Sequence, residues 1–187
     1  MNPLAFALAL QGSLAFAADT NSHSHPATLA THEHGVGQLN LALDQQRLDI
    51  ELEVPAFNLL GFEHQPRQLE EKKRLSLVYQ QLNQPLQLFA VKQEAQCSIT
   101  QAQVLNDIES DEHEHEHEHE HEHEHETHWN IRANYQLNCQ AFERLTQIDL
   151  SPFFKAFPNT QSLQVQMIGP NGQQGIKATL KDSLLVP

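Results

Sequence analysis

Two neighbouring stretches alternate strictly between apolar and polar residues. Leucines occupy every second position in residues 39–43, and apolar side chains alternate with acidic ones in residues 48–54. A repeat of two is typical of β-strands with one buried face. Residues 44–47 supply a turn, so we expect a β-hairpin whose acidic face is solvated; the alternative for that face is a metal-binding surface.

Two segments instead predict helices. In residues 66–82 the apolar positions follow helical spacing, and Pro85 prevents easy continuation. A second, short helix is expected to start at Ser151-Pro152 and to end at Pro158. This helix carries three phenylalanines, Phe153, Phe154 and Phe157.

Further alternating stretches predict two more hairpins. Residues 97–105 and 129–139 read as strands, and an antiparallel register would align four pairs: Cys97 with Cys139, Ile99 with Leu137, Gln101 with Tyr135 and Leu105 with Ile131. Residues 163–167 and 176–180 flank the turn signal Asn171-Gly172. The expected fold is therefore α+β, a six-stranded antiparallel sheet built from hairpins, with two helices.

The charge of the chain is concentrated in one segment. Lys and Arg number 11 and Asp and Glu number 24, a formal net charge of −13. Eleven of these acids lie between Asp107 and Glu126, so the rest, with 13 acids and 11 bases, is almost neutral. Because no basic stripe is present, we exclude nucleic acid as a partner.

This acidic segment alternates glutamate with histidine. No apolar residue lies between Asp111 and His128, so we expect residues 107–128 to form a disordered insert. Alternation places the imidazoles on one edge of an extended chain, and imidazole binds Zn²⁺, Ni²⁺ and Cu²⁺. The alternative is a solvated acidic spacer. The candidate ligands are His113, His115, His117, His119, His121, His123, His125 and His128.

The N-terminus predicts export. Apolar residues dominate 4–10, and Ala15-Phe16-Ala17 has the small-x-small pattern of a cleavage site. We expect a signal peptide at 1–17, a disordered leader at 18–30 and a folded domain at 31–187. No later apolar run is long enough for a membrane span, so the mature protein is expected in a periplasm or outside the cell. A buried N-terminal helix is the alternative.

Cys97 and Cys139 are the two cysteines of the chain. In an exported protein an even number of cysteines indicates a disulfide. The competing interpretation is a pair of thiolate metal ligands, although neither cysteine has another Cys or a His at close ligand spacing.

Further histidines flank the predicted strands. His32 and His34 precede a glycine, and we consider a defined site there with Glu63 or His64 folded against them. A lone histidine such as His64 is more often a structural residue. Outside the alternating His/Glu tract the sequence contains no His-Glu-x-x-His, and it contains no Gly-x-Ser-x-Gly or phosphate-binding glycine loop, so we do not expect an enzyme.

Several motifs together resemble one known family. They are His32-Glu33-His34-Gly35, the block Asn58-Leu59-x-Gly61-Phe62-Glu63-His64, Tyr135-x-Leu137-x-Cys139 and Phe153-x-x-x-Phe157-Pro158. With the His-rich insert they resemble the ZrgA-type family of bacterial periplasmic zinc-uptake proteins, from about residue 31 to the end of the chain.

The resemblance implies zinc as the metal and periplasmic capture for an inner-membrane zinc importer as the task. It carries a ligand role onto the insert histidines, His32 and His34, and Glu63 and His64. A different function, storage or buffering of excess zinc, nickel or copper, would use the same chemistry.

Overall fold

The computed structural model describes residues 33–106 and 129–187. The expected signal peptide at 1–17, the leader at 18–30, His32 and the histidine tract therefore lie outside the described residues. The expectation that the leader and the tract are disordered also concerns residues outside the described ranges.

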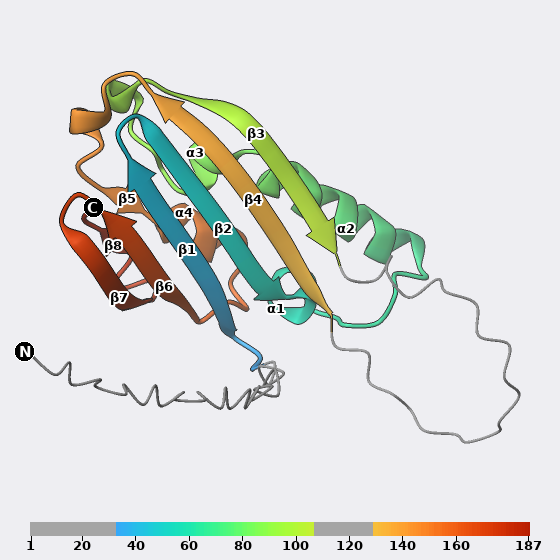
Figure 1. The fold of residues 1–187 in the computed structure, drawn as a ribbon. Coiled ribbons are helices and arrows are strands. Elements are labelled where there is room, and N and C mark those ends of the chain that lie inside the picture. The colour runs from blue at the N-terminus through green and yellow to red at the C-terminus, as the bar shows by residue number, and fades with distance from the viewer. Residues whose placement is uncertain (1–32, 107–128) are drawn as a thin grey trace, which may run out of the picture. The chain divides into compact units, whose positions relative to one another are not determined.

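A six-stranded sheet is the frame of the described fold, with strands in the order β3-β4-β2-β1-β6-β7 (Figure 1). Its strands are β1 (Val36–Asp44), β2 (Arg47–Pro55), β3 (Cys97–Asn106), β4 (Asn130–Cys139), β6 (Ser162–Gly169) and β7 (Gly172–Ala178). Two short strands, β5 (Ile148–Asp149) and β8 (Leu184–Leu185), pair separately. All three predicted hairpins are present.

The described part contains more helices than the two that the sequence predicts. They are α1 (Ala56–Leu60), α2 (Leu69–Leu82), α3 (Pro85–Leu88) and α4 (Ser151–Ala156), with short 3-10 turns η1 (Gln93–Ala95) and η3 (Phe142–Arg144). Helix α2 begins three residues later than expected because Gln68 and Glu71 form a capping box at its start. None of the described helices is both long and apolar enough to cross a membrane.

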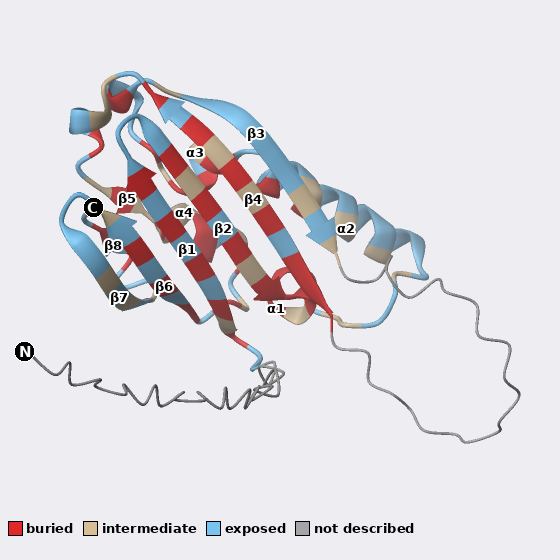
Figure 2. Ribbon diagram, in the orientation of Figure 1, coloured by how far each residue is buried: buried red, intermediate tan, exposed pale blue. Residues whose placement is uncertain are grey.

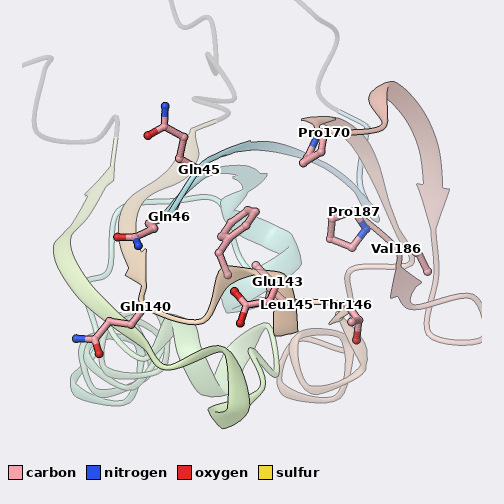
Figure 3. A pocket seen from close by; sticks show the side chains of 10 residues that line it. Gln45, Gln46, Gln140, Glu143, Leu145, Thr146, Pro170, Val186 and Pro187 are labelled. Atoms are coloured by element: carbon pink, nitrogen blue, oxygen red, sulfur yellow. The ribbon is translucent and has the colours of Figure 1, made fainter.

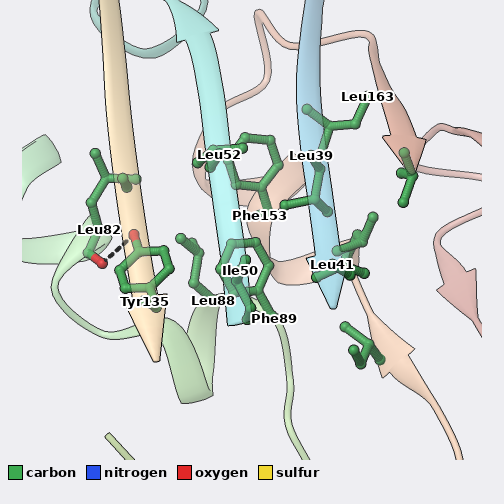
Figure 4. Close-up of a cluster of buried hydrophobic side chains, with 14 of the residues drawn as sticks. Leu39, Leu41, Ile50, Leu52, Leu82, Leu88, Phe89, Tyr135, Phe153 and Leu163 are labelled. Atoms are coloured by element: carbon green, nitrogen blue, oxygen red, sulfur yellow. Dashed lines mark hydrogen bonds between the residues drawn. The ribbon is translucent and has the colours of Figure 1, made fainter. Parts of the chain in front are cut away.

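Alternating burial follows β1 and β2, as the sequence pattern predicts (Figure 2). The helices lie on one side of the sheet, and its apolar side chains pack beneath them. In the centre, the ring of Phe89 meets Tyr135 edge-on and stacks on Phe153. The hydroxyl of Tyr135 donates to the carbonyl of Leu82 at 2.7 Å and so ties the sheet to α2 (Figure 4).

The expectation of a purely antiparallel sheet is wrong, because β1 and β6 run parallel. Helix α4 returns the chain to the end of the sheet where β1 starts. There the backbone N–H groups of Gln161 and Ser162 donate to the carbonyl of Gly35 at 2.7 and 3.0 Å. Strand β6 therefore enters beside the start of β1 and continues in the same direction, which makes the sheet mixed.

The predicted register of β3 against β4 is right only for its first part. Cys97 pairs with Cys139 and Ile99 with Leu137, but a bulge follows Ile99. Thr100 is the extra residue, and its hydroxyl donates to the carbonyl of Gln136 at 2.9 Å. Beyond the bulge each partner is displaced by one. Gln101 therefore meets Gln136, Leu105 meets Arg132, and Ala102 takes the place opposite Tyr135.

The structure contains the expected disulfide between Cys97 and Cys139. It joins β3 and β4 at one end of their hairpin, and the chain leaves and re-enters the described fold at the other end. Because both sulfurs are covalently bonded, the structure holds no cysteine thiolate as a metal ligand.

Tyr135→Phe should remove part of the alkaline sensitivity of the fold. Burial raises the pKa of the Tyr135 hydroxyl, whereas a tyrosine in the unfolded chain ionises near pH ~10. The stability from this group is therefore complete below that pH and is lost as the pH rises above it. At neutral pH the variant should lose about 1 kcal/mol of unfolding free energy, because the hydrogen bond to Leu82 is removed. At alkaline pH its stability should decline less steeply than that of the native chain.

Urea unfolding across neutral and alkaline pH measures both effects. Tyr79→Phe, which alters the other tyrosine of the chain, is the control and should keep the steep alkaline decline. An unchanged pH profile for Tyr135→Phe would contradict the prediction.

Candidate metal centre

His34 and Glu63 come together at the end of the sheet where β1 begins. The Nε2 atom of His34 lies 2.8 Å from Oε1 of Glu63, across 29 positions of sequence. The imidazole also stacks on the ring of Phe57, with centroids 4.4 Å apart and an interplanar angle of 9°. The His34 side chain is 49% exposed and that of Glu63 16%. Solvent therefore reaches an imidazole whose orientation is held from two sides.

A buried amide positions this pair. Asn58, on α1, accepts a hydrogen bond from the backbone N–H of Gly35 at 2.7 Å and donates to the carbonyl of Val36 at 3.1 Å. Gly35 has φ +86°, and a Cβ there would lie 3.0 Å from the side chain of Gln161. The tight turn after His34 therefore requires glycine, and Asn58 fixes that turn to α1.

The segment after α1 carries Glu63 back toward His34. Gly61 ends the helix in the left-handed conformation at φ +84°, and its N–H donates to the carbonyl of Phe57 at 2.8 Å. The indole N–H of Trp129 then donates to the carbonyl of Glu63 at 2.6 Å. Two backbone constraints therefore set the position from which the Glu63 carboxylate contacts His34.

His64 pairs with a different acid, Glu71 on α2. Its Nε2 atom lies 3.5 Å from Oε1 of Glu71, and its ring stacks on Phe62 with centroids 5.0 Å apart. The backbone N–H groups of Gln68 and Arg67 donate to Glu71 and hold the pKa of this carboxyl below its usual value. Glu71 is thus an ionised carboxylate at neutral pH.

The distances within the two pairs indicate what each can do with a metal. Two ligands of a tetrahedral zinc, each about 2.05 Å from the ion, lie roughly 3.3 Å apart. The 3.5 Å between His64 and Glu71 is close to this value. The 2.8 Å between His34 and Glu63 is a hydrogen-bond distance. That pair suits a carboxylate that orients an imidazole, as outer-shell acids do around metal-bound histidines.

Neither pair forms a complete metal site by itself. In residues 33–106 and 129–187, no group of three or more His, Cys, Asp or Glu side chains is arranged to hold a metal ion. Of the candidate residues from the sequence, the structure brings His34 and Glu63 together and separates His64 into a pair with Glu71. Any further ligands for these two pairs would have to come from outside the described ranges.

The attachment points of the histidine tract lie at this same end of the fold. Asn106, the last described residue before it, donates from its side-chain amide to the hydroxyl of Tyr79. Trp129, the first described residue after it, contacts Glu63 as described above and accepts from the N–H of Ala56 at 2.9 Å. Both attachment points are thus fixed to α1, α2 and the segment that carries Glu63.

Sequence reasoning missed the residues that position the pairs. Asn58 begins one of the family motifs but was given no role, and Trp129 has no local signal, because the partners of both residues are distant in the chain. Glu71 could have been found, since an acid three positions after the residue that begins a helix is a capping-box signature.

A surface cavity lies elsewhere, at the opposite end of the strands (Figure 3). It measures about 770 Å³ and is formed by the β1–β2 turn, η3 and the C-terminal residues. Its lining contains no histidine and a single acidic side chain, Glu143, and the other side chains are apolar or amide apart from the hydroxyl of Thr146. The cavity lacks the ligands that transition metals prefer.

Asn58→Ala should destabilise the fold and loosen the His34 pair. The substitution leaves the N–H of Gly35 without its buried partner, at a cost of about 2 kcal/mol. Asn159→Ala is the matched control, because Asn159 also contacts α1 but through a long, 3.4 Å hydrogen bond to Phe57. Chemical unfolding measures stability, and NMR of the His34 ring reports its environment. Equal costs for the two variants would contradict the role assigned to Asn58.

Comparison with known proteins supports the resemblance that the motifs indicated. The model of the family described as ZrgA family zinc uptake protein matches residues 31–185. A search of curated proteins gives no match. The match covers every described strand and helix, together with the tract between β3 and β4. The chain belongs to the ZrgA family of zinc uptake proteins.

Proposed function

We propose that this protein is exported, captures Zn²⁺ in the periplasm and supplies it to an inner-membrane zinc importer. The observation that carries the proposal is the run of seven histidines alternating with glutamates, inserted in a domain of a zinc uptake family. Neutral imidazole is the commonest protein ligand for zinc, and the adjacent carboxylates attract divalent cations. The proposed activity is binding and transfer, without catalysis.

A repeated ligand suits transfer better than a closed site does. Each imidazole of the tract has an equivalent neighbour two positions away, so a bound ion can exchange one ligand for the next. A structural zinc site with four fixed ligands binds far more tightly and releases its ion slowly. The tract should therefore bind several ions, each with modest affinity.

The folded pairs are proposed as the tighter part of the same system. His34 with Glu63, and His64 with Glu71, lie at the end of the fold where the tract is attached. Their donors are already ordered, so metal binding there costs less conformational entropy than it does at unstructured ligands. Histidines of the tract, together with His32, would supply the remaining ligands.

Replacing the tract should remove most of the bound zinc and leave the domain folded. The test replaces the seven histidines at positions 113–125 with glutamine and leaves the glutamates in place. Isothermal titration calorimetry should show a large drop in the number of zinc ions bound. The matched control replaces the seven interleaved glutamates, at positions 114–126, with glutamine and should keep most of the stoichiometry. If the histidine variant binds as many ions as the native chain, the proposal is wrong.

His34 and His64 should contribute to the affinity for zinc more than to the number of zinc ions bound. In the otherwise native chain, His34→Gln with His64→Gln should leave most of the zinc stoichiometry but abolish the tightest sites. Competition against a chromophoric chelator measures this. His23→Gln with His25→Gln removes the same number of imidazoles from the N-terminal region and is the control. Identical competition curves for the two double variants would exclude the folded pairs as ligands.

The direction of transport needs a separate measurement in cells. A strain lacking the protein should grow poorly when zinc is scarce, and the native gene should restore growth. If the strain is instead sensitive only to excess zinc, nickel or copper, the protein is a buffer and the uptake proposal fails.

A further inference from the structure

Strand β3 is a long and unprotected edge of the sheet. It pairs with β4 on one side, and among the described residues no strand pairs with its other side. Residues 98–103 are all exposed, and none of its ten residues is charged or proline. Natural proteins usually protect such an edge with lysine, proline or a covering element, because its backbone groups can pair with another chain.

The opposite edge of the sheet is built differently. Strand β7 has seven residues, of which Gly172 and Gly175 weaken strand pairing and Lys177 carries an exposed charge. The sheet therefore has one edge that favours the addition of a strand and one that disfavours it.

Helix α2 offers a surface beneath the place that an additional strand, paired with the free edge of β3, would occupy. A groove of about 640 Å³ runs along the helix and is lined by Leu75, Ser76, Tyr79 and neighbouring polar residues. Tyr79 also contacts Asn106 at the end of β3, so the groove is on the side of the helix that faces this edge. Ala102 and Val104 of β3 pair with the buried Tyr135 and Ala133 and so face the same layer. An added strand would cover this layer.

We propose that a second copy of this chain occupies that position, with the two β3 strands antiparallel across a two-fold axis. The bulge at Thr100 interrupts the ladder, so the pairing would use residues 101–105 and place Gln103 opposite its own copy at the two-fold axis. This segment is uncharged, and self-pairing therefore brings no like charges opposite each other. Since the same patch is used on both copies and β7 is a poor edge, association stops at the dimer.

The acidic tract favours the antiparallel arrangement over a parallel one. Eleven acids follow within twenty residues of Asn106. In antiparallel pairing the two Asn106 residues lie just beyond opposite ends of the shared ladder, about 20 Å apart. That separation exceeds the Debye length of about 8 Å at physiological salt, so the repulsion between the attachment points is screened. Parallel pairing would place the two tracts side by side.

Sedimentation equilibrium of the full chain in EDTA tests the dimer without metal bridging between tracts. The native chain should show a monomer–dimer equilibrium that shifts toward the dimer as salt rises. Gln103→Lys, which places a charge at the centre of the pairing segment, should weaken the dimer about fivefold or more. The matched control is Gln173→Lys on β7, an exposed glutamine on the other edge, and should leave the dimer unchanged.

Three outcomes would overturn the proposal. They are a native chain that remains monomeric at high concentration in EDTA, a dimer that forms only with zinc, and an equal effect of the two lysine variants. A positive test is cross-linking, because Gln103→Cys near the two-fold axis should form a disulfide between copies on mild oxidation. Gln173→Cys should not. Failure of Gln103→Cys to cross-link beyond this control would also exclude the antiparallel pairing.

Discussion

The buried amide of Asn58 is the interaction on which the arrangement at this end of the molecule depends. It connects the turn at Gly35 to helix α1 through two hydrogen bonds, and Asn58 itself is 1% exposed. The same turn accepts the two N–H groups that start β6 beside β1. One side chain therefore fixes the beginning of β1, the entry of β6 and the position of His34. Buried polar groups of this kind are costly unless fully paired, and here both halves of the amide are.

Local sequence patterns predicted the strands and helices whose formation depends on residues close together in the chain. Strict alternation gave the hairpin of β1 and β2, and the proline and phenylalanine spacing gave α4. The parallel pairing of β1 with β6 could not be read in this way, because it follows from where α4 returns the chain. The bulge at Thr100 is similar, since a single extra residue leaves the alternation nearly intact and still displaces every later pair.

The candidate site likewise contains one contact that the sequence suggested and one that only the tertiary structure shows. A site in which Glu63 or His64 folds against His32 and His34 was considered from the sequence, and the structure brings Glu63 to His34 across 29 positions. The pairing of His64 with Glu71 was not anticipated, because Glu71 reads as a surface residue of a helix until its capping role is recognised. The tract histidines are identified by composition alone, and their residues lie outside the described ranges. Sequence thus names candidate ligands, whereas tertiary structure decides which of them lie together.

The position of the disulfide has a consequence for how the protein tolerates proteases. Cys97 and Cys139 flank the tract in sequence, at a separation of 42 residues, and every hydrogen bond of the β3–β4 ladder lies between them and the tract. A cut anywhere in residues 107–128 would therefore leave two fragments that remain one covalent molecule, with the sheet still assembled. In an oxidising compartment, such a nicked molecule keeps its fold and loses only the continuity of the histidine tract.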